Sequence, residues 1–598
     1  MDKQSIFKAI FERDDKAQKE KASHNTNFFS REISGSVTQR LKQIHSKRFF
    51  LFTNAIADLI SHISTRIYGT AILCFGLVGT LLYFLGLSAD NNIATPILGI
   101  LLSGLAIPFL LTDKPLPVFL QDFDLTDFLF FEFFCMKRHS AMESVKSFPV
   151  AVAIAIGIVL ALVSALVPMW QIALAILILI AIYIGLESPE FVFLTSLLAL
   201  PYIRFIPHSE IVFALAIILA VFSFIIKVMY GRRVFHFEQY DIIIGVMLLF
   251  VLISGVFVKG FESFGGSIKM LIFALGYILA GNIIANRRLA IHSANSIIFS
   301  ATVSSIISIS QVVTTIVNLG SKTTQSDISF VLARQDGVAA FLMVATILAI
   351  GLAAQASKAT KLVNGIAAFL CLAAMVISGE FLAISSLILA FIAYFIIKHN
   401  KLPAILLTLL LAASVAVLLL PNNILNIIFT FSPSVISAKD LFNLWNKCLQ
   451  LMADNLAVGI GIGAESFAIE MAAIGVVGHT DSSNLFIELG LEAGILAPIC
   501  FIFVLITRLQ HRYMQYLYVR NSEIERISNL SGACLFSMIA FGMVNYIWSD
   551  PSTYYLFWCV FGIGSATLRK AKKDYDDRVI YYEESSAFDS SVIDIEIG

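Results

Sequence analysis

The chain is a nearly unbroken succession of apolar runs, most of them as long as a helix that crosses a lipid bilayer. Such a helix needs about 20 mostly apolar residues. With 58% hydrophobic and 14% charged residues, the 598-residue chain does not read as a set of soluble domains. The sequence predicts an all-α polytopic integral membrane protein with about 16 transmembrane helices. They are expected at 68–88, 93–112, 148–168, 169–187, 191–206, 211–229, 241–258, 268–285, 296–318, 334–355, 362–378, 381–397, 403–420, 484–507, 528–547 and 552–568.

The basic residues between these runs predict the orientation of the chain. Residues 1–50 hold eleven Lys and Arg against six Asp and Glu, which places the amino terminus in the cytoplasm by the positive-inside rule. Alternating sides from there puts these clusters inside as well: 137–138, 232–233, 287–288, 358–361, 398–401, 508–520 and 569–573. We therefore predict a multi-pass protein of the cytoplasmic (plasma) membrane with both termini in the cytoplasm.

Six segments follow from this topology. A basic cytoplasmic segment is predicted first, and then an amino-terminal membrane extension that includes an aromatic interfacial segment at 113–147. Core helices, one extracytoplasmic loop, carboxy-terminal helices and an acidic cytoplasmic tail complete the chain. The predicted boundaries are 1–67, 68–187, 188–420, 421–483, 484–573 and 574–598.

The loop 421–483 is the longest polar interval between predicted spans, so chemistry is expected there. It runs into the apolar segment that begins at Asn484. Residues 440–452 within it have apolar side chains at helical spacing and predict an amphipathic helix at the outer mouth of the bundle. The charged and titratable residues of the loop include Lys439, Lys447, Glu465, Glu470, His479 and Asp481.

Two polar residues are candidates for a site. Arg334 begins the predicted helix 334–355, and its rigid guanidinium suits phosphate oxygens. The same residue is equally well explained as a partner of Asp336 or as a side chain that reaches the lipid headgroups. His479 can exchange a proton near neutral pH where the loop re-enters the membrane, although a loop histidine taken alone is more often simply solvated.

The cysteines favour neither a disulfide framework nor a metal site. No CxxC motif and no Cys/His cluster is present in the sequence. We therefore predict no metal and no cofactor. The seven cysteines are scattered over Cys74, Cys135, Cys371, Cys448, Cys500, Cys534 and Cys559.

The polar loop also carries a pattern found in a known family. Trp445 is followed by the run NLAVGIGIG at 455–463 and by HTDSSNLFIELGLEAG at 479–494. This order resembles the signature of the O-antigen ligase and Wzy-type polymerase superfamily, over residues 331–506. The resemblance implies a glycosyltransferase C-like membrane fold, with the first four predicted helices as an extension.

The resemblance implies roles for particular residues. His479 is expected to orient or deprotonate an acceptor hydroxyl, while Arg334 and Lys439 hold the diphosphate of an undecaprenyl-diphosphate glycan. Two positions depart from the family pattern: Lys439 stands where many members have arginine, and Glu380 stands where many end a Ser-x-Ser-Arg motif. Because Glu380 has the wrong sign for phosphate, either the donor is oriented differently or Glu380 acts on the acceptor.

The same resemblance makes Asn484 and Gly461 substrate-binding candidates. The glycines at 459, 461 and 463 would let the backbone pass close to the substrate. An ordinary flexible turn explains these glycines equally well. The implied activity is metal-independent inverting transfer of the glycan to another glycan or an envelope molecule, as a ligase or a polymerase. The expected partners are these two substrates, the bilayer and other polysaccharide-assembly proteins, without nucleic acid.

Two other functions remain open. A transporter or flippase of lipid-linked sugars is one, although such folds usually show internal repeats and broken helices at the membrane midplane. A non-catalytic membrane partner in envelope assembly is the other, and the departures at Glu380 and Lys439 favour it.

Overall fold

The computed structural model describes most of the chain and is built from helices. No β-strand is present in the residues it describes, so the predicted all-α class is confirmed. These residues are 35, 36, 38–40, 62–89, 92–136, 138, 148–205, 209–230, 232–258, 261–319, 336–354, 357–377, 381–398, 438–476, 478–516 and 523–571.

The chain divides into two compact units, which we call the small and the large unit. The small unit comprises Gln39–Val192 and Leu219–Arg233. The large unit comprises Met1–Thr38, Phe193–Ile218 and Val234–Gly598. Two of the unit boundaries fall inside helices, α9 (Pro189–Ala199) and α10 (Ser209–Met229).

The small unit is built from helices. At one end, the Ser64 hydroxyl donates to the Asp113 carboxylate at 3.1 Å, which ties the start of α3 to the segment after α4. At the other end, the Ala89 N–H donates to the Ser164 carbonyl at 3.0 Å. Helix interfaces use small residues, since Gly157 lies against the backbone of Ala71. The elements are α3 (Thr65–Phe84), α4 (Ala94–Leu110), α5 (Leu116–Gln121), α6 (Asp124–Thr126), η1 (Asp127–Phe133), α7 (Val150–Val163) and α8 (Met169–Glu187).

The large unit is a helical bundle around the helix at 551–571. That helix is apolar on all sides and almost completely buried, as expected for a helix in the middle of a bundle. Two of its buried hydroxyls bond to neighbouring elements: Tyr555 to Ser196 at 2.8 Å and Ser565 to Tyr240 at 2.8 Å. The surrounding elements are η2 (Leu200–Phe205), α11 (Gln239–Phe257), α12 (Phe261–Ile283), α13 (Arg287–Leu319), α15 (Asp336–Ala353), α16 (Lys358–Ile377), α17 (Phe381–Lys398), α20 (Ala438–Asp454), α21 (Ala464–Ala473), α22 (Leu485–Ala493), α23 (Leu496–Tyr516), α24 (Glu523–Gly542) and η5 (Ile547–Ser549).

Seven helices in the described part of the chain are long and apolar enough to cross a membrane. α8 shows why a bilayer is needed, because it buries only Met169, Ile172 and Gly185 and exposes apolar side chains elsewhere. An apolar surface of that extent is unfavourable in water and favourable in lipid. The seven lie at Thr65–Phe84, Met169–Glu187, Ser209–Met229, Gln239–Phe257, Ser263–Ile283, Arg287–Gln311 and Lys358–Ile377.

Several predicted spans differ from the helices found. The span predicted at 484–507 is two helices, α22 and α23, because the chain breaks at Gly494, where φ is +80°. The span predicted at 528–547 ends at Gly542, where α24 stops. The span predicted at 403–420 lies outside the described residues.

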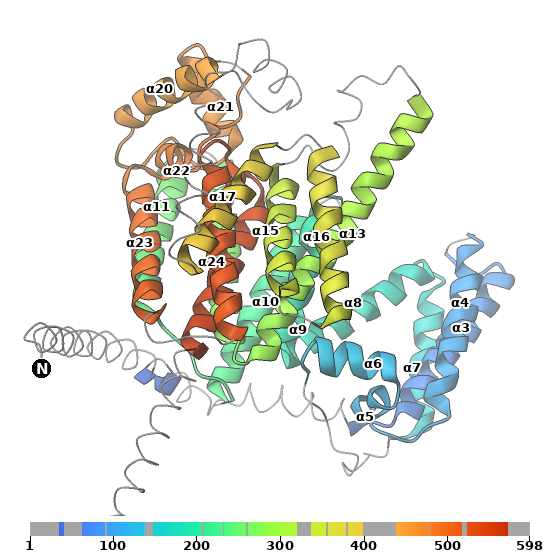
Figure 1. The fold of residues 1–598 in the computed structure, drawn as a ribbon. Coiled ribbons are helices and arrows are strands. Elements are labelled where there is room, and N and C mark those ends of the chain that lie inside the picture. The colour runs from blue at the N-terminus through green and yellow to red at the C-terminus, as the bar shows by residue number, and fades with distance from the viewer. Residues whose placement is uncertain are drawn as a thin grey trace, which may run out of the picture. The chain divides into compact units, whose positions relative to one another are not determined.

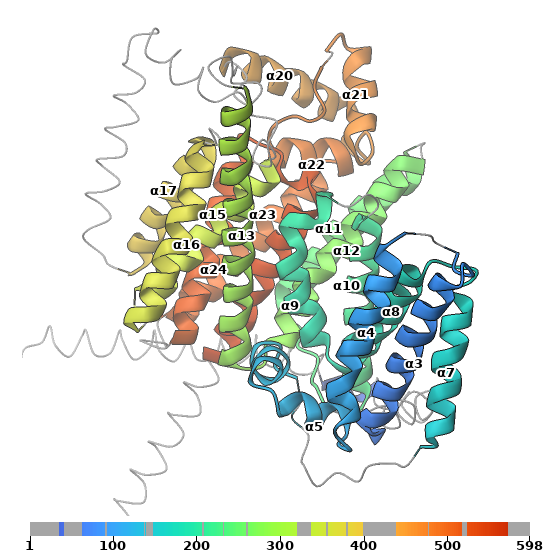
Figure 2. The same ribbon diagram turned by 90° about the vertical axis from the view of Figure 1, so that its right-hand side faces the viewer.

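The predicted amphipathic helix at 440–452 is confirmed as α20. It buries Leu444, Cys448 and Leu451 against Phe467 and Met471 of α21. Within the large unit, α20 and α21 lie beyond one end of the bundle, on the side where α22 begins (Figure 1; Figure 2). They form a small cap with its own core, which we call the α20–α21 cap.

Candidate functional site

The turn that carries His479 is fixed on both sides by hydrogen bonds. The Asp481 carboxylate accepts the Ser483 N–H at 2.9 Å, and Ser483 has the unusual φ of +52°. The Ser482 carbonyl accepts the Trp445 indole N–H at 2.9 Å, which ties the turn to α20. The His479 side chain is half-buried and makes no hydrogen bond with a described residue. The turn thus presents an imidazole that remains available to another molecule.

Asn484 anchors the far end of this turn. Its side-chain oxygen accepts the N–H groups of Phe486 at 3.0 Å and Ile487 at 3.2 Å, which makes it the N-cap of α22. Its side-chain N–H donates to the Met543 carbonyl at 2.7 Å. These bonds give Asn484 a role in supporting the turn, and its role in substrate binding stays a prediction.

Gly461 is placed against the bundle. It is buried with φ of +100°, and a Cβ atom there would lie 2.8 Å from both the Ser263 hydroxyl and Val258. Gly459 has φ of +76°, and its Cβ would lie 2.3 Å from the Leu491 carbonyl. Only glycine fits these two positions, because the chain passes close to neighbouring backbone and side chains of the protein itself.

Two glutamates on α22 are buried and accept hydrogen bonds from the segments around that helix. Glu488 is 1% exposed and accepts the Ser482 N–H at 2.6 Å. Glu492 is 2% exposed and accepts the Tyr546 hydroxyl at 2.6 Å and the Gly463 N–H at 3.1 Å. The pair therefore connects three segments: the His479 turn, the glycine-rich turn at 459–463 and the segment after α24.

Burial controls the protonation of this pair. α22 has nine residues and is too short to span a membrane. Burial, followed by the charge of Glu492, raises the pKa of the Glu488 carboxyl. Burial likewise raises the pKa of the Glu492 carboxyl, against the opposing effect of the bonds from Tyr546 and Gly463. A proton on the pair is therefore favoured above the pH at which an exposed glutamate ionises.

Sequence reasoning assigned no role to these glutamates. They stand four residues apart on an apolar helix, so they share one face. This spacing is the sequence feature that could have indicated a pair of carboxyls. Glu492 is bonded by Tyr546, which is 54 residues away from it along the chain. That contact is invisible before the chain is folded.

The predicted cations are not placed with His479. Arg334 and Glu380 lie outside the described residues. Lys439 falls in the first turn of α20, but its side chain also lies outside them. Of the predicted site residues, the structure brings together His479 and Asn484 at the start of α22, and Gly461 on the turn that contacts the end of α22.

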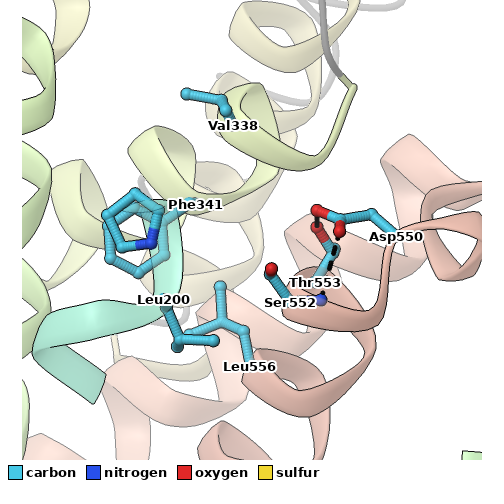
Figure 3. Close-up of a pocket in the computed structure, with 8 residues that line it drawn as sticks. Leu200, Val338, Phe341, Asp550, Ser552, Thr553 and Leu556 are labelled. Carbon is cyan, nitrogen blue, oxygen red and sulfur yellow. Dashed lines mark hydrogen bonds between the residues drawn. The ribbon is translucent and has the colours of Figure 1, made fainter. Parts of the chain in front are cut away.

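The cavity in Figure 3 lies at the start of the helix at 551–571. The Asp550 carboxylate accepts the Ser552 N–H at 3.2 Å and the Thr553 hydroxyl at 3.1 Å, so it caps this helix. Leu200 and Phe341 close the other side (Figure 3). The volume of about 10 Å³ suits about one water molecule and excludes a sugar or a phosphate ester.

The chemistry available at the His479 turn is proton exchange by an imidazole. In the part of the chain that the structure describes, no three His, Cys, Asp or Glu side chains gather as metal ligands. No protein-family model and no curated protein matches the sequence. The assignment of a function therefore depends on the site itself and on the sequence pattern around it.

Proposed function

We propose that this protein transfers or polymerises a glycan from a lipid diphosphate onto an acceptor hydroxyl at the outer face of the cytoplasmic membrane. The observation that supports this most is the His479 turn, which holds a half-buried imidazole without a bonded partner among the described residues. The proposal includes the predicted topology of about 16 spans with the loop 421–483 outside.

The reaction needs one proton acceptor and a stabilised leaving group. The acceptor oxygen forms a bond to the anomeric carbon while the bond from that carbon to the diphosphate oxygen breaks. The acceptor proton moves to His479, an effect worth about 10²–10⁴-fold in rate for general base catalysis. Arg334 and Lys439 neutralise the charge that develops on the departing lipid diphosphate.

α22 supports this chemistry by fixing the turn. The Ser482 N–H is held by Glu488, and the Ser482 carbonyl is held by Trp445, so residue 482 is fixed from both faces. A base that is pre-positioned loses less entropy when the substrate arrives. The cap residue Asn484 has the same effect from the carboxyl side of the turn.

The experiment compares two neighbouring positions on one turn. Purified protein is reconstituted into vesicles with an undecaprenyl-diphosphate glycan and an acceptor glycan, and the elongated product and released carrier are measured. His479→Ala is expected to reduce product formation about 10²–10⁴-fold. Thr480→Ala, which changes an exposed neighbour, is the matched control and is expected to retain it.

The other functions predict different results. A transporter would move the lipid-linked glycan across the vesicle membrane without forming a glycosidic bond. A non-catalytic partner would do neither. Either result with the wild-type protein, or full product formation by His479→Ala, would overturn the proposal.

A further inference from the structure

A charged cavity lies in the small unit, and the proposed glycan chemistry does not involve it. Its volume is about 190 Å³, below the range of about 300–1,000 Å³ that suits drug-sized ligands. A small polar group is a better match for this space. The cavity is lined by Cys135, Glu187, Ser188, Glu190, Lys227, Arg232 and Arg233.

Two chain turns meet at this cavity. α8 ends at Glu187, and the Ser188 hydroxyl accepts the Phe191 N–H at 3.3 Å at the start of α9. After α10 the chain turns back, because the N–H groups of Arg232 and Arg233 both reach the Lys227 carbonyl, at 3.0 and 3.3 Å. The basic side chains that follow α10 are thereby gathered around the start of α9.

Glu190 fixes two of these cations. Its side chain is buried, accepts a hydrogen bond from Arg233 and lies 3.5 Å from the Lys227 ammonium. A buried carboxylate is stable only with such partners. Ser188 also donates to Glu190 at 3.3 Å. The carboxylate therefore sets the positions of Lys227 and Arg233 at the cavity wall.

The cavity is lined by more positive than negative side chains. Lys227, Arg232 and Arg233 give three positive charges against two from Glu187 and Glu190, and Glu187 is exposed. An ammonium has three N–H donors and a guanidinium five, so donors remain after Glu190 is bonded. Arg232 is exposed and lies over the Tyr230 ring at 5.7 Å, and it does not pair with Glu190. The N-terminus of α9, whose helix dipole favours an anion, starts at the same wall.

The cavity lies at the end of its unit that holds the Lys and Arg residues. The end of η1 belongs there, since Cys135 lines the cavity and the Phe134 ring lies 4.5 Å from the Phe191 ring of α9. The other basic residues of this segment are Arg66, Lys114 and Arg138, and each of them pairs with an aspartate. The turns at the opposite end, residues 85–93 and 164–168, contain no Lys or Arg. A basic pocket between membrane helices at one membrane face is the known setting for acidic lipid headgroups.

We propose that this cavity binds a phosphate group, held by Arg232, Arg233 and Lys227. The phosphate belongs either to an anionic phospholipid headgroup or to a soluble phosphate, and both offer the oxygens that guanidinium groups bind. Glu190 keeps two of the cations in place when the cavity is empty.

The test measures lipid retention by native mass spectrometry of the full-length protein in detergent, titrated separately with phosphatidylglycerol, phosphatidylcholine and inorganic phosphate. Phosphatidylglycerol is expected to bind more tightly than phosphatidylcholine. Arg232→Gln is expected to weaken this binding about fivefold, the equivalent of about 1 kcal/mol for one basic residue near a lipid surface. Lys227→Gln is expected to act in the same direction.

Lys114→Gln is the matched control, because Lys114 is exposed at the same end of the unit, pairs with Asp122 and does not line the cavity. Displacement of phosphatidylglycerol by inorganic phosphate would support a soluble phosphate as ligand, and its absence would support the headgroup. Equal binding of both lipids without phosphate binding would overturn the proposal. Unchanged binding in Arg232→Gln, which leaves the Glu190 ion pairs intact, would overturn it as well.

Discussion

Glu488 and Glu492 are buried carboxyls in a segment that the sequence predicts as a membrane helix. Each accepts a short hydrogen bond, from Ser482 and from Tyr546 respectively, so neither is an isolated charge. Burial nevertheless raises the pKa of both groups. Because the folded state binds protons more tightly than the unfolded state, the proton content of this pair is linked to stability.

The pair predicts how stability changes with pH. Between the ordinary glutamate pKa of about 4.3 and the raised values, the unfolded state binds fewer protons, so the free energy of unfolding falls as pH rises. Each pH unit in that interval contributes about 1.4 kcal/mol per group. Thermal unfolding in detergent is expected to show this fall, and Glu488→Gln with Glu492→Gln is expected to flatten it. Glu465→Gln with Glu470→Gln, two exposed carboxylates on α21, is the control that retains the slope.

Gly461 gives a second prediction for a single residue. Gly461→Ala introduces a Cβ 2.8 Å from Ser263 and Val258 at φ of +100°, so it combines backbone strain with a steric clash. Gly463→Ala, at φ of +114° with open space around it, introduces the strain alone. Strain at such a φ costs about 1–3 kcal/mol. Thermal unfolding is expected to show a larger loss for Gly461→Ala, and equal losses would contradict the placement of Gly461 against α12.

At the scale of elements, α22 is the short helix on which the His479 turn depends. Its N-terminus is capped by Asn484, and its C-terminal carbonyls are used outside the helix, since the Ile460 N–H donates to the Leu491 carbonyl at 2.7 Å. The Ser254 hydroxyl of α11 donates to the Glu492 carbonyl. α22 is therefore bonded at both ends to other parts of the large unit.

Substitutions of Asn484 test how much its N-cap bonds and its bond to Met543 each contribute to stability. Asn484→Ala removes the cap and the bond to Met543, and loss of an N-cap alone costs about 0.5–2 kcal/mol. Asn484→Ser keeps an uncharged acceptor for the helix N–H groups and removes the amide donor to Met543, so a smaller loss is expected. Unfolding midpoints and glycan transfer are both measured. A stable Asn484→Ala protein with unchanged transfer would show that the turn does not need this cap.

For the whole molecule, the positive-inside rule predicts which end of the large unit faces outward. The α20–α21 cap lies at one end of that bundle, and the positive-inside rule predicts that this end is extracytoplasmic (Figure 1). Thr480 is exposed on the His479 turn, so a label at this residue shows on which side of the membrane this end lies. Lys358, at the start of α16, is predicted to be cytoplasmic.

Labelling of introduced cysteines tests this orientation. A membrane-impermeant maleimide is expected to label Thr480→Cys in intact cells and Lys358→Cys only after permeabilisation. The wild-type protein, with its seven cysteines, sets the background. Labelling of Thr480→Cys only in permeabilised cells would place the His479 turn in the cytoplasm and would remove the glycan-transfer proposal.

The sequence by itself determined the all-α membrane class and the amphipathic α20, because helix formation follows from the local period and length of apolar runs. It did not predict the break between α22 and α23. Only the tertiary structure showed that Asn484 caps α22 at the His479 turn and that Gly461 lies against Ser263 and Val258. It also showed that Glu488 and Glu492 are buried and that Glu190 gathers cations at a cavity. These properties depend on contacts between residues far apart in the chain, and a local pattern carries no information about them.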